Sequence, residues 1–379
     1  RPRRTLNRLA LALVGTAAGG LGQLFFYRDS LWDGLFLYGI AIILFTQALV
    51  NRLWPKALPL PAPPRLLFSM ALRRGWRRNF GVWLMLLALG FSAIAFSFFG
   101  NEDARLQGWW LYLASLILFT SGGVLLTTGD SWRITLQQWL PDCRVTSGLL
   151  TVVALALFMR LFNFYGQPFG IWYDEAEAGL EARQMLTQAD YRPIFYPPIN
   201  VSGHLLALYA LALEWLGDNI YSLRLVSVLF GLGGVLAAYL FGQELRGPRF
   251  GLLLAFLVAV ARWHVNFSRI AMTGVDAIFF EFLSLYFLTR LIRSGRPREA
   301  LWAGLSLGFG LLFYTAFRLF VVALIVFAII GAFRWTRWVA VTWQNGGWRV
   351  QMMNLALLLL SGWLVVMPLV KYALDNPEA

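Results

Sequence analysis

Long apolar runs separated by short polar or basic loops make up most of this chain of 379 residues. Eleven of the runs approach the roughly 20 residues that an α-helix needs to cross the hydrocarbon core of a bilayer. They lie at residues 9–27, 31–50, 80–99, 108–127, 145–164, 222–242, 250–267, 276–293, 299–316, 317–333 and 351–370. The pattern therefore predicts an all-α polytopic membrane protein with about eleven transmembrane helices.

A further apolar stretch, residues 199–216, is also long enough to cross, and its placement decides the topology of all later spans. Lys and Arg in short loops favour the cytoplasmic side. If the stretch stays on the outer side, one face collects 22 of the 32 Lys and Arg residues, in loops 1–8, 51–78, 128–144, 243–249, 290–298 and 334–349. If it crosses, nine of these arginines move outside. We therefore expect an interfacial or re-entrant helix at 199–216, a cytoplasmic N-terminus and an external acid-rich face.

Composition supports a membrane protein and excludes a soluble globular one. Hydrophobic residues make up 59% of the chain, charged residues make up 13%, and the mean hydropathy is +0.63. The net charge of +13 sorts by loop, so it indicates membrane topology and not nucleic-acid binding. The single cysteine, Cys143, excludes an intramolecular disulfide, and no Cys/His spacing indicates a zinc site.

Two linkers suggest how the chain is divided. Residues 51–79 combine five prolines with seven basic residues, which suits a stiff segment on anionic headgroups, and residues 128–148 form a second inside linker. We therefore expect residues 1–140 to form a four-helix membrane unit and residues 141–379 to form a second module. The outer loops of the first unit show no recognisable chemistry, so its role stays open, including contacts with membrane-complex partners.

The polar loop at residues 165–200 is the place where chemistry is expected. Asp174, Glu175, Glu177 and Glu181 fall within eight residues, in a chain with only 19 acidic residues. Apolar spans surround the loop on both sides. Water, charge and aromatic side chains can therefore meet a substrate there, at the outer end of the span that precedes it.

Several motifs after residue 145 occur in the order and spacing of a known superfamily. They are WYDEAEAG in the first outer loop, YPPINVSGHLLALYALAL, YSLRLVSVLFGLGGVLAAYLFGQEL, WHVNFSRIAMTGVDAIFFEFLSLYFL and LLFYTAFRLF. With them the chain resembles the GT-C superfamily of membrane glycosyltransferases, in the glycosyltransferase family 39-like branch of protein O-mannosyltransferases and lipid A aminoarabinose transferases. The resemblance covers about residues 145–379. It implies a C-terminally incomplete module, because the later helices and outer domain of the family have no counterpart here.

The resemblance implies an inverting transferase that moves a sugar from a polyprenyl-phosphate donor to a protein, lipid or glycan at the outer face of a plasma membrane. Such a reaction needs a carboxylate to accept the proton of the acceptor. Asp174, at the first-loop carboxylate position, would be this base, with Glu175 and Asp276 as orienting or metal-binding partners. A divalent cation, magnesium or manganese, held by Asp174 and Asp276, is the one cofactor expected.

Cations and aromatic side chains near the outer ends of the spans complete the predicted site. Arginine can bind a lipid phosphate with two parallel hydrogen bonds and offset the charge of the leaving group. The predicted substrate contacts are Arg224, Arg269, Arg318, Tyr173, Tyr196 and His204. Tyr196 stands where this branch usually has histidine, so any role of that histidine does not carry over.

Each predicted site residue also has a structural interpretation. Asp174 and Glu177 have the spacing of a capping box, and Asp276 could simply cap its span. The arginines could anchor the spans by snorkelling, and the tyrosines could belong to an interfacial aromatic belt. His204 and His264 could be hydrogen-bonded interfacial residues.

Two other functions stay open at this point. A non-catalytic membrane subunit could use the same scaffold without a complete site. A transporter of lipid-linked sugars would place its charged residues near the midplane, between structural repeats. The charges here gather on one face, which disfavours transport.

Overall fold

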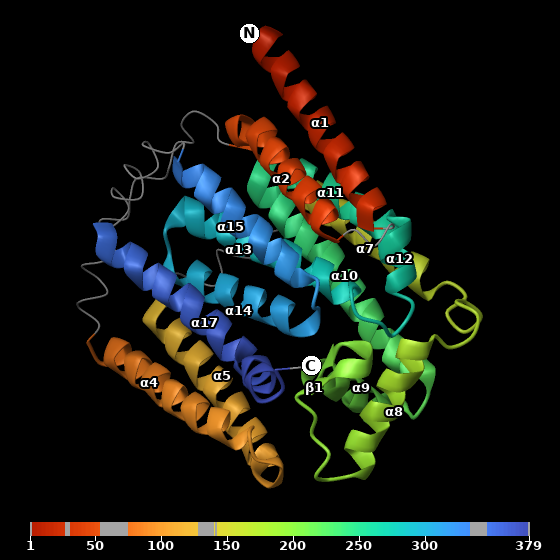
Figure 1. Ribbon diagram of the computed structural model, residues 1–379, viewed down its shortest axis with the longest axis vertical. Coiled ribbons are helices and arrows are strands. Elements are labelled where there is room, and N and C mark those ends of the chain that lie inside the picture. The colour runs from red at the N-terminus through yellow and green to blue at the C-terminus, as the bar shows by residue number, and fades with distance from the viewer. Residues whose placement is uncertain are drawn as a thin grey trace. The chain divides into compact units, whose positions relative to one another are not determined.

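The computed structural model describes residues 2–26, 31–53, 75–127, 140, 142–333 and 347–377. These residues are almost entirely helical (Figure 1), which confirms the predicted all-α class. Five of the described helices are both long and apolar enough to span a membrane, and several shorter apolar helices accompany them. The chain is therefore an all-α polytopic membrane protein.

The described residues fall into two compact units. Unit 1 takes in residues up to 63 together with 318–344, and unit 2 takes in 64–317 together with 345–379. Unit 1 contains α1 (Pro2–Phe26), α2 (Leu31–Leu53) and nearly all of α15 (Phe317–Phe333). Within it α1 and α2 pack closely, since a Cβ at Gly22 would lie 3.1 Å from the carbonyl oxygen of Gly34.

Unit 2 holds the candidate site and most of the predicted spans. Its helices are α4 (Gly75–Phe98), α5 (Arg105–Thr127), α7 (Cys143–Leu161), α8 (Tyr173–Thr187), α9 (Gly203–Leu216), α10 (Ile220–Arg246), α11 (Pro248–Val260), α12 (Arg262–Phe267), α13 (Val275–Ser294), α14 (Pro297–Phe313) and α17 (Gly347–Asp375). Short elements connect them: η1 (Glu102–Ala104), β1 (Phe195–Tyr196), η2 (Pro197–Ile199) and β2 (Val201–Ser202). The two strands pair antiparallel, with Phe195 opposite Ser202.

The helices of unit 2 agree with the predicted spans to within a few residues, with one exception. The run 250–267, predicted as one span, is two helices, α11 and α12, separated by a break at Ala261. Ala261 has ψ of 116°, which is not helical. Arg262 and His264 come directly after it, so the helix breaks where the sequence changes from apolar to polar.

The stretch predicted to lie at the interface forms a short helix. α9 has 14 residues, and at about 1.5 Å per residue it measures roughly 21 Å, less than the roughly 30 Å of a bilayer core. Ser202 caps its first turn by accepting from the N–H of Leu205, and the helix ends at Gly217 with φ of 104°. This length agrees with a placement at the outer interface, which itself stays a prediction.

The predicted grouping of the first four spans as residues 1–140 also stays a prediction. By their contacts, α4 and α5 belong to unit 2 and form a hairpin that packs against α14 and α17 (Figure 1). The Tyr112 hydroxyl of α5 donates to the carbonyl of Val365 in α17 at 2.9 Å. The hairpin therefore helps to build the same core as the module that carries the motifs. The basic, proline-rich linker 54–74 lies outside the described residues.

Candidate functional site

A buried ion pair between Glu175 and Arg224 forms the centre of the site. Arg224 Nε and Nη2 donate to the two carboxylate oxygens of Glu175 at 2.7 and 2.8 Å, and both side chains are almost fully buried. Glu175 also accepts from the backbone N–H of Ala271 at 2.9 Å and of Trp172 at 3.3 Å. Glu175 therefore ties α8 to α10 and to the loop before α13, with four hydrogen bonds on its two oxygens.

Both arginines predicted to contact phosphate in this unit bind protein groups. Besides Glu175, Arg224 donates to the carbonyls of Gly170 and Pro168 at 2.8 and 3.4 Å. Within the part of the chain that the structure describes, one of its five N–H groups has no partner. Arg269 donates to four carbonyls near the end of α7, those of Met159, Phe162, Asn163 and Gln167. Arg269 thus satisfies carbonyls that a helix C-terminus leaves free. The predicted phosphate contacts of these residues stay predictions.

Asp174 differs from its neighbour Glu175 in having no bonded partner. Helix α8 begins at Tyr173 with Trp172 as its N-cap, so Asp174 is the second residue of the helix and not its cap. The capping-box interpretation of Asp174 with Glu177 is therefore wrong by two residues, since Glu175 reaches back to Trp172 instead. Asp174 is half-buried, and its carboxylate makes no hydrogen bond or ion pair among the described residues.

Asp276 lies in the first turn of α13 and is 2% exposed. One carboxylate oxygen accepts from the N–H of Gly274 at 2.6 Å, while the other, Oδ2, is buried without a partner among the described residues. The Tyr209 hydroxyl of α9 lies near both acids of the site. Burial is the main cause that raises the pKa of Tyr209. The negative charges of Asp276 and Glu175 raise this pKa further, and a hydrogen bond with Ser227 lowers it. The hydroxyl of Tyr209 therefore lies within range of the charges of both carboxylates.

Tyrosines and acids form a second cluster on α8 and the loop after it. Tyr191 donates a hydrogen bond to Glu181, and Tyr196 donates to Glu177 at 3.3 Å. Burial and the two glutamates raise the pKa of Tyr196 to about 12. The charge of Glu177 chiefly raises the pKa of the exposed Tyr173. Both predicted sugar-contacting tyrosines, Tyr173 and Tyr196, thus lie along the acidic face of α8 and remain protonated at neutral pH.

His204 is packed inside the protein, at the first turn of α9. Its Nε2 lies 3.0 Å from the Tyr112 hydroxyl, and its ring meets those of Trp109 and Tyr112 edge to face. Burial lowers the pKa of His204 to about 3, so the ring is neutral. These contacts fit the hydrogen-bonded interpretation, and its predicted contact with substrate stays a prediction.

Two further predictions concern Arg318 and a metal ion. Arg318 lies in the first turn of α15, in unit 1, and its side chain is exposed. In the part of the chain that the structure describes, no three His, Cys, Asp or Glu side chains gather closely enough to hold a metal ion. A cation on Asp174 and Asp276 would need other ligands, such as substrate oxygens. Both assignments stay predictions.

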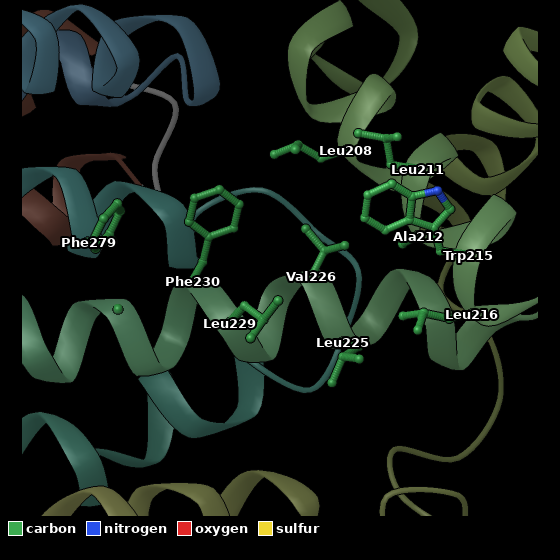
Figure 2. Close-up of a pocket in the computed structure, with 11 residues that line it drawn as sticks. Leu208, Leu211, Ala212, Trp215, Leu216, Leu225, Val226, Leu229, Phe230 and Phe279 are labelled. Carbon is green, nitrogen blue, oxygen red and sulfur yellow. The ribbon is translucent and has the colours of Figure 1, made fainter.

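An apolar groove lies between α9 and α10 (Figure 2). It has a volume of about 450 Å³, and all the residues that line it are apolar: Leu208, Leu211, Ala212, Trp215, Leu216, Leu225, Val226, Leu229, Phe230, Gly233 and Phe279. In Figure 2 the side chains of Val226 and Phe230 point toward Leu208 and Leu211 of α9 across this space. The groove is thus built on α9 and α10, the same two helices that carry Tyr209 and Ser227.

Sequence reasoning missed Tyr209, Ser227 and the backbone N–H of Ala271. Tyr209 and Ser227 lie within apolar runs and have no pattern that marks them. The Ala271 amide could not have been found, because a backbone group becomes a ligand only when the fold places it. The sequence did mark the acids of α8, Asp276 and the arginines near the helix ends.

The fold and the site define a polytopic membrane protein with buried and half-buried acids in the first turns of α8 and α13. Residues 204–365 match the family described as dolichyl-phosphate-mannose-protein mannosyltransferase. The match confirms the resemblance drawn from the motifs and indicates a membrane glycosyltransferase of the mannosyltransferase type. It begins at His204, after the loop with Asp174. No curated protein and no solved structure gives a significant match to the chain.

Proposed function

We propose that the protein transfers a sugar from a polyprenyl-phosphate-linked donor to an acceptor at the outer face of the plasma membrane, with inversion at the sugar carbon. Asp174 accepts the proton of the acceptor hydroxyl as its oxygen attacks the anomeric carbon. The bond from that carbon to the lipid phosphate breaks, and the phosphate leaves with the bonding electrons. The family match supports the class of reaction.

The observation that carries the assignment of Asp174 is the contrast between two adjacent carboxylates. Glu175 is buried and has four hydrogen bonds, whereas Asp174 is half-buried and has no bonded partner among the described residues. A general base needs a lone pair that is free to accept a proton. Glu175 therefore fixes the start of α8, and Asp174 is presented to the acceptor.

The groove between α9 and α10 supports a lipid-linked donor. Its lining is apolar throughout, and α9 is too short to cross the bilayer core, so the groove would open toward lipid at the outer interface. A polyprenyl chain fits such a surface, and its phosphate would lie outside the apolar lining. Arg224 has one N–H without a hydrogen-bond partner among the described residues, and we propose that this N–H binds the phosphate.

Replacing Asp174 by Asn tests the proposal. Asn keeps the size of the side chain and is tolerated in a first helical turn, so folding and abundance should match wild type. Transfer should fall by about 10²–10⁴-fold, the usual contribution of a positioned general base. The measurement is transfer of radiolabelled sugar from a polyprenyl-phosphate donor in membranes that contain the protein.

Asp190→Asn is the matched control, because Asp190 lies in the same outer segment and is exposed. It should transfer at the wild-type rate. Full activity in Asp174→Asn would remove Asp174 from the mechanism. A wild-type protein that transfers no sugar from any tested donor, although folded, would favour the non-catalytic subunit instead.

A further inference from the structure

A fully buried arginine of α7 lies against α11 and α12, and it has no ion-pair partner among the described residues. Arg160 is 0% exposed. Its Nη1 donates to the carbonyls of Ala156 and Ala259 at 2.9 and 3.2 Å, its Nε donates to Ser268 Oγ at 3.2 Å, and its Nη2 lies 2.7 Å from Nδ1 of His264. Because arginine only donates, His264 Nδ1 is the acceptor, and the ring is neutral with its proton on Nε2.

The neighbouring helix α10 leaves space for this network at two glycines. A Cβ at Gly231 would lie 2.4 Å from Ser268 Oγ and 2.9 Å from Arg160 Nε. A Cβ at Gly234 would lie 3.1 Å from His264 Nε2. The glycines on this face of α10 thus let its backbone approach a polar cluster that any larger residue would displace.

The network holds the chain where the helix is broken. Because the helix breaks at Ala261, the last carbonyls of α11 lose their helical hydrogen-bond partners. Arg160 donates a hydrogen bond to one of them, the carbonyl of Ala259. On the other side of the break, Ser268 Oγ donates to the carbonyl of His264 and accepts from Arg160. Arg160 therefore fixes both sides of the break with one side chain.

The segment that follows Ser268 leads directly to the Glu175 carboxylate. Arg269 binds the carbonyls at the end of α7, and the N–H of Ala271 donates to Glu175 Oε1 at 2.9 Å. We propose that Arg160 is a positioning residue, which through Ser268 holds the backbone at 268–271 so that Ala271 and Arg224 can bind Glu175 together. Its effect on transfer rests on the proposed function, whereas its effect on this segment does not.

A plain packing role for Arg160 predicts something different. Loss of a packing contact lowers the stability of the whole helix bundle, and amide exchange then rises in all its helices. Loss of a positioning contact raises exchange first in the segment that it holds. Amide hydrogen exchange of the full chain in detergent, read by mass spectrometry for the peptide around Ala271, separates the two.

Ser268→Ala is the informative variant, because it removes one hydroxyl and leaves Arg160 three partners. Ser284→Ala is its matched control: Ser284 is equally buried, and its hydroxyl has no partner among the described residues. We expect at least about fivefold faster exchange around Ala271 in Ser268→Ala, which loses the hydrogen bonds of this hydroxyl to Arg160 and to the His264 carbonyl. We expect no change there in Ser284→Ala. Arg160→Lys, which cannot replace all the bonds of the guanidinium, should act in the same direction.

Unchanged exchange around Ala271 in Ser268→Ala would overturn the proposal, as would a uniform rise in all helices. If Arg160→Lys does not fold, Ser268→Ala decides alone. With an active donor assay, Ser268→Ala should lower kcat and leave the KM for the donor unchanged, because the groove is untouched. If the wild-type protein has no transfer activity, the proposed function is wrong. The positioning role of Arg160 is then tested by the exchange measurement alone.

Discussion

At the scale of single residues, the site depends on how two adjacent acids are partnered. Glu175 and Asp174 have the same charge and lie in the same helical turn, yet only Glu175 faces Arg224. Consecutive residues of a helix point in directions about 100° apart, so one can face the core while the next faces the site opening. The two acids therefore differ in role because their surroundings differ: Glu175 is held in an ion pair, whereas Asp174 is the proposed base.

We predict that Arg224→Gln destabilises the protein by about 3–5 kcal/mol, because it leaves the Glu175 carboxylate buried without a counter-charge. The double variant Glu175→Gln/Arg224→Gln should be more stable than Arg224→Gln, since it removes that charge. Thermal unfolding of the purified variants in detergent measures both. A double variant no more stable than the single one would show that the ion pair does not dominate.

At the scale of elements, small residues determine how closely helices pack in the core of unit 2. Gly304 of α14 faces α17 so closely that a Cβ there would lie 2.0 Å from Ser361 Oγ and 2.2 Å from the Leu358 carbonyl oxygen. Gly308, one turn later, would meet Val365 at 2.7 Å. Membrane helices commonly approach one another over such small residues spaced four apart.

We predict that Gly304→Ala destabilises unit 2 by about 1–3 kcal/mol, because the added methyl group must push the backbones of α14 and α17 apart. Gly90→Ala is the control, since a Cβ at Gly90 of α4 meets no atom within 4 Å. In a helix that change should be neutral or slightly stabilising. Equal unfolding temperatures for the two variants would contradict the close packing of α14 on α17.

The contact between α9 and α5 predicts a pH effect on stability. The pKa of His204 is lowered from 6.5 to about 3 by burial, so the unfolded chain binds a proton that the folded chain does not. The contribution of neutral His204 to the free energy of unfolding is fully present above pH 6.5, and it is lost progressively as the pH falls toward 3. At pH 5 the loss should reach about 2 kcal/mol.

His204→Gln should remove this part of the pH dependence, because glutamine does not titrate in the range. The unfolding free energies of both proteins, measured by denaturant titration at several pH values between 7 and 4, give the comparison. Parallel pH profiles for the wild type and the variant would mean that His204 can be protonated in the folded protein.

At the scale of the whole molecule, the distribution of basic residues predicts which ends of the helices face the cytoplasm. The acidic loop with Asp174 and the arginine-rich turn between α13 and α14 should then lie on opposite sides of the membrane. The short helix α9 makes this arrangement physically reasonable, since a helix of 14 residues spans the core poorly.

We predict that cysteines placed at Gln188 and Arg296, each in a chain with Cys143 replaced, react with a membrane-impermeant thiol reagent from opposite sides. Gln188 should be labelled in intact cells, and Arg296 only after the membrane is opened. Labelling of both positions from the same side would contradict the predicted topology.

The sequence by itself determined the class of fold, the helix bounds to within a few residues and the family resemblance. Hydrophobic length and motif order are local properties, so a single chain displays them directly. It also marked Asp174, Glu175 and Asp276 as candidate site residues, since acids are rare in such a chain and these lie beside helix starts.

Only the tertiary structure decided which of these residues have partners. The pairing of Glu175 with Arg224 joins residues 49 apart in sequence, and the bond from Ala271 uses a backbone group that no side-chain pattern reveals. The break at Ala261 and the burial of Arg160 depend in the same way on contacts between distant helices. Such contacts form only when the chain packs, because a side chain gains a partner from the elements that surround it and not from its neighbours in sequence.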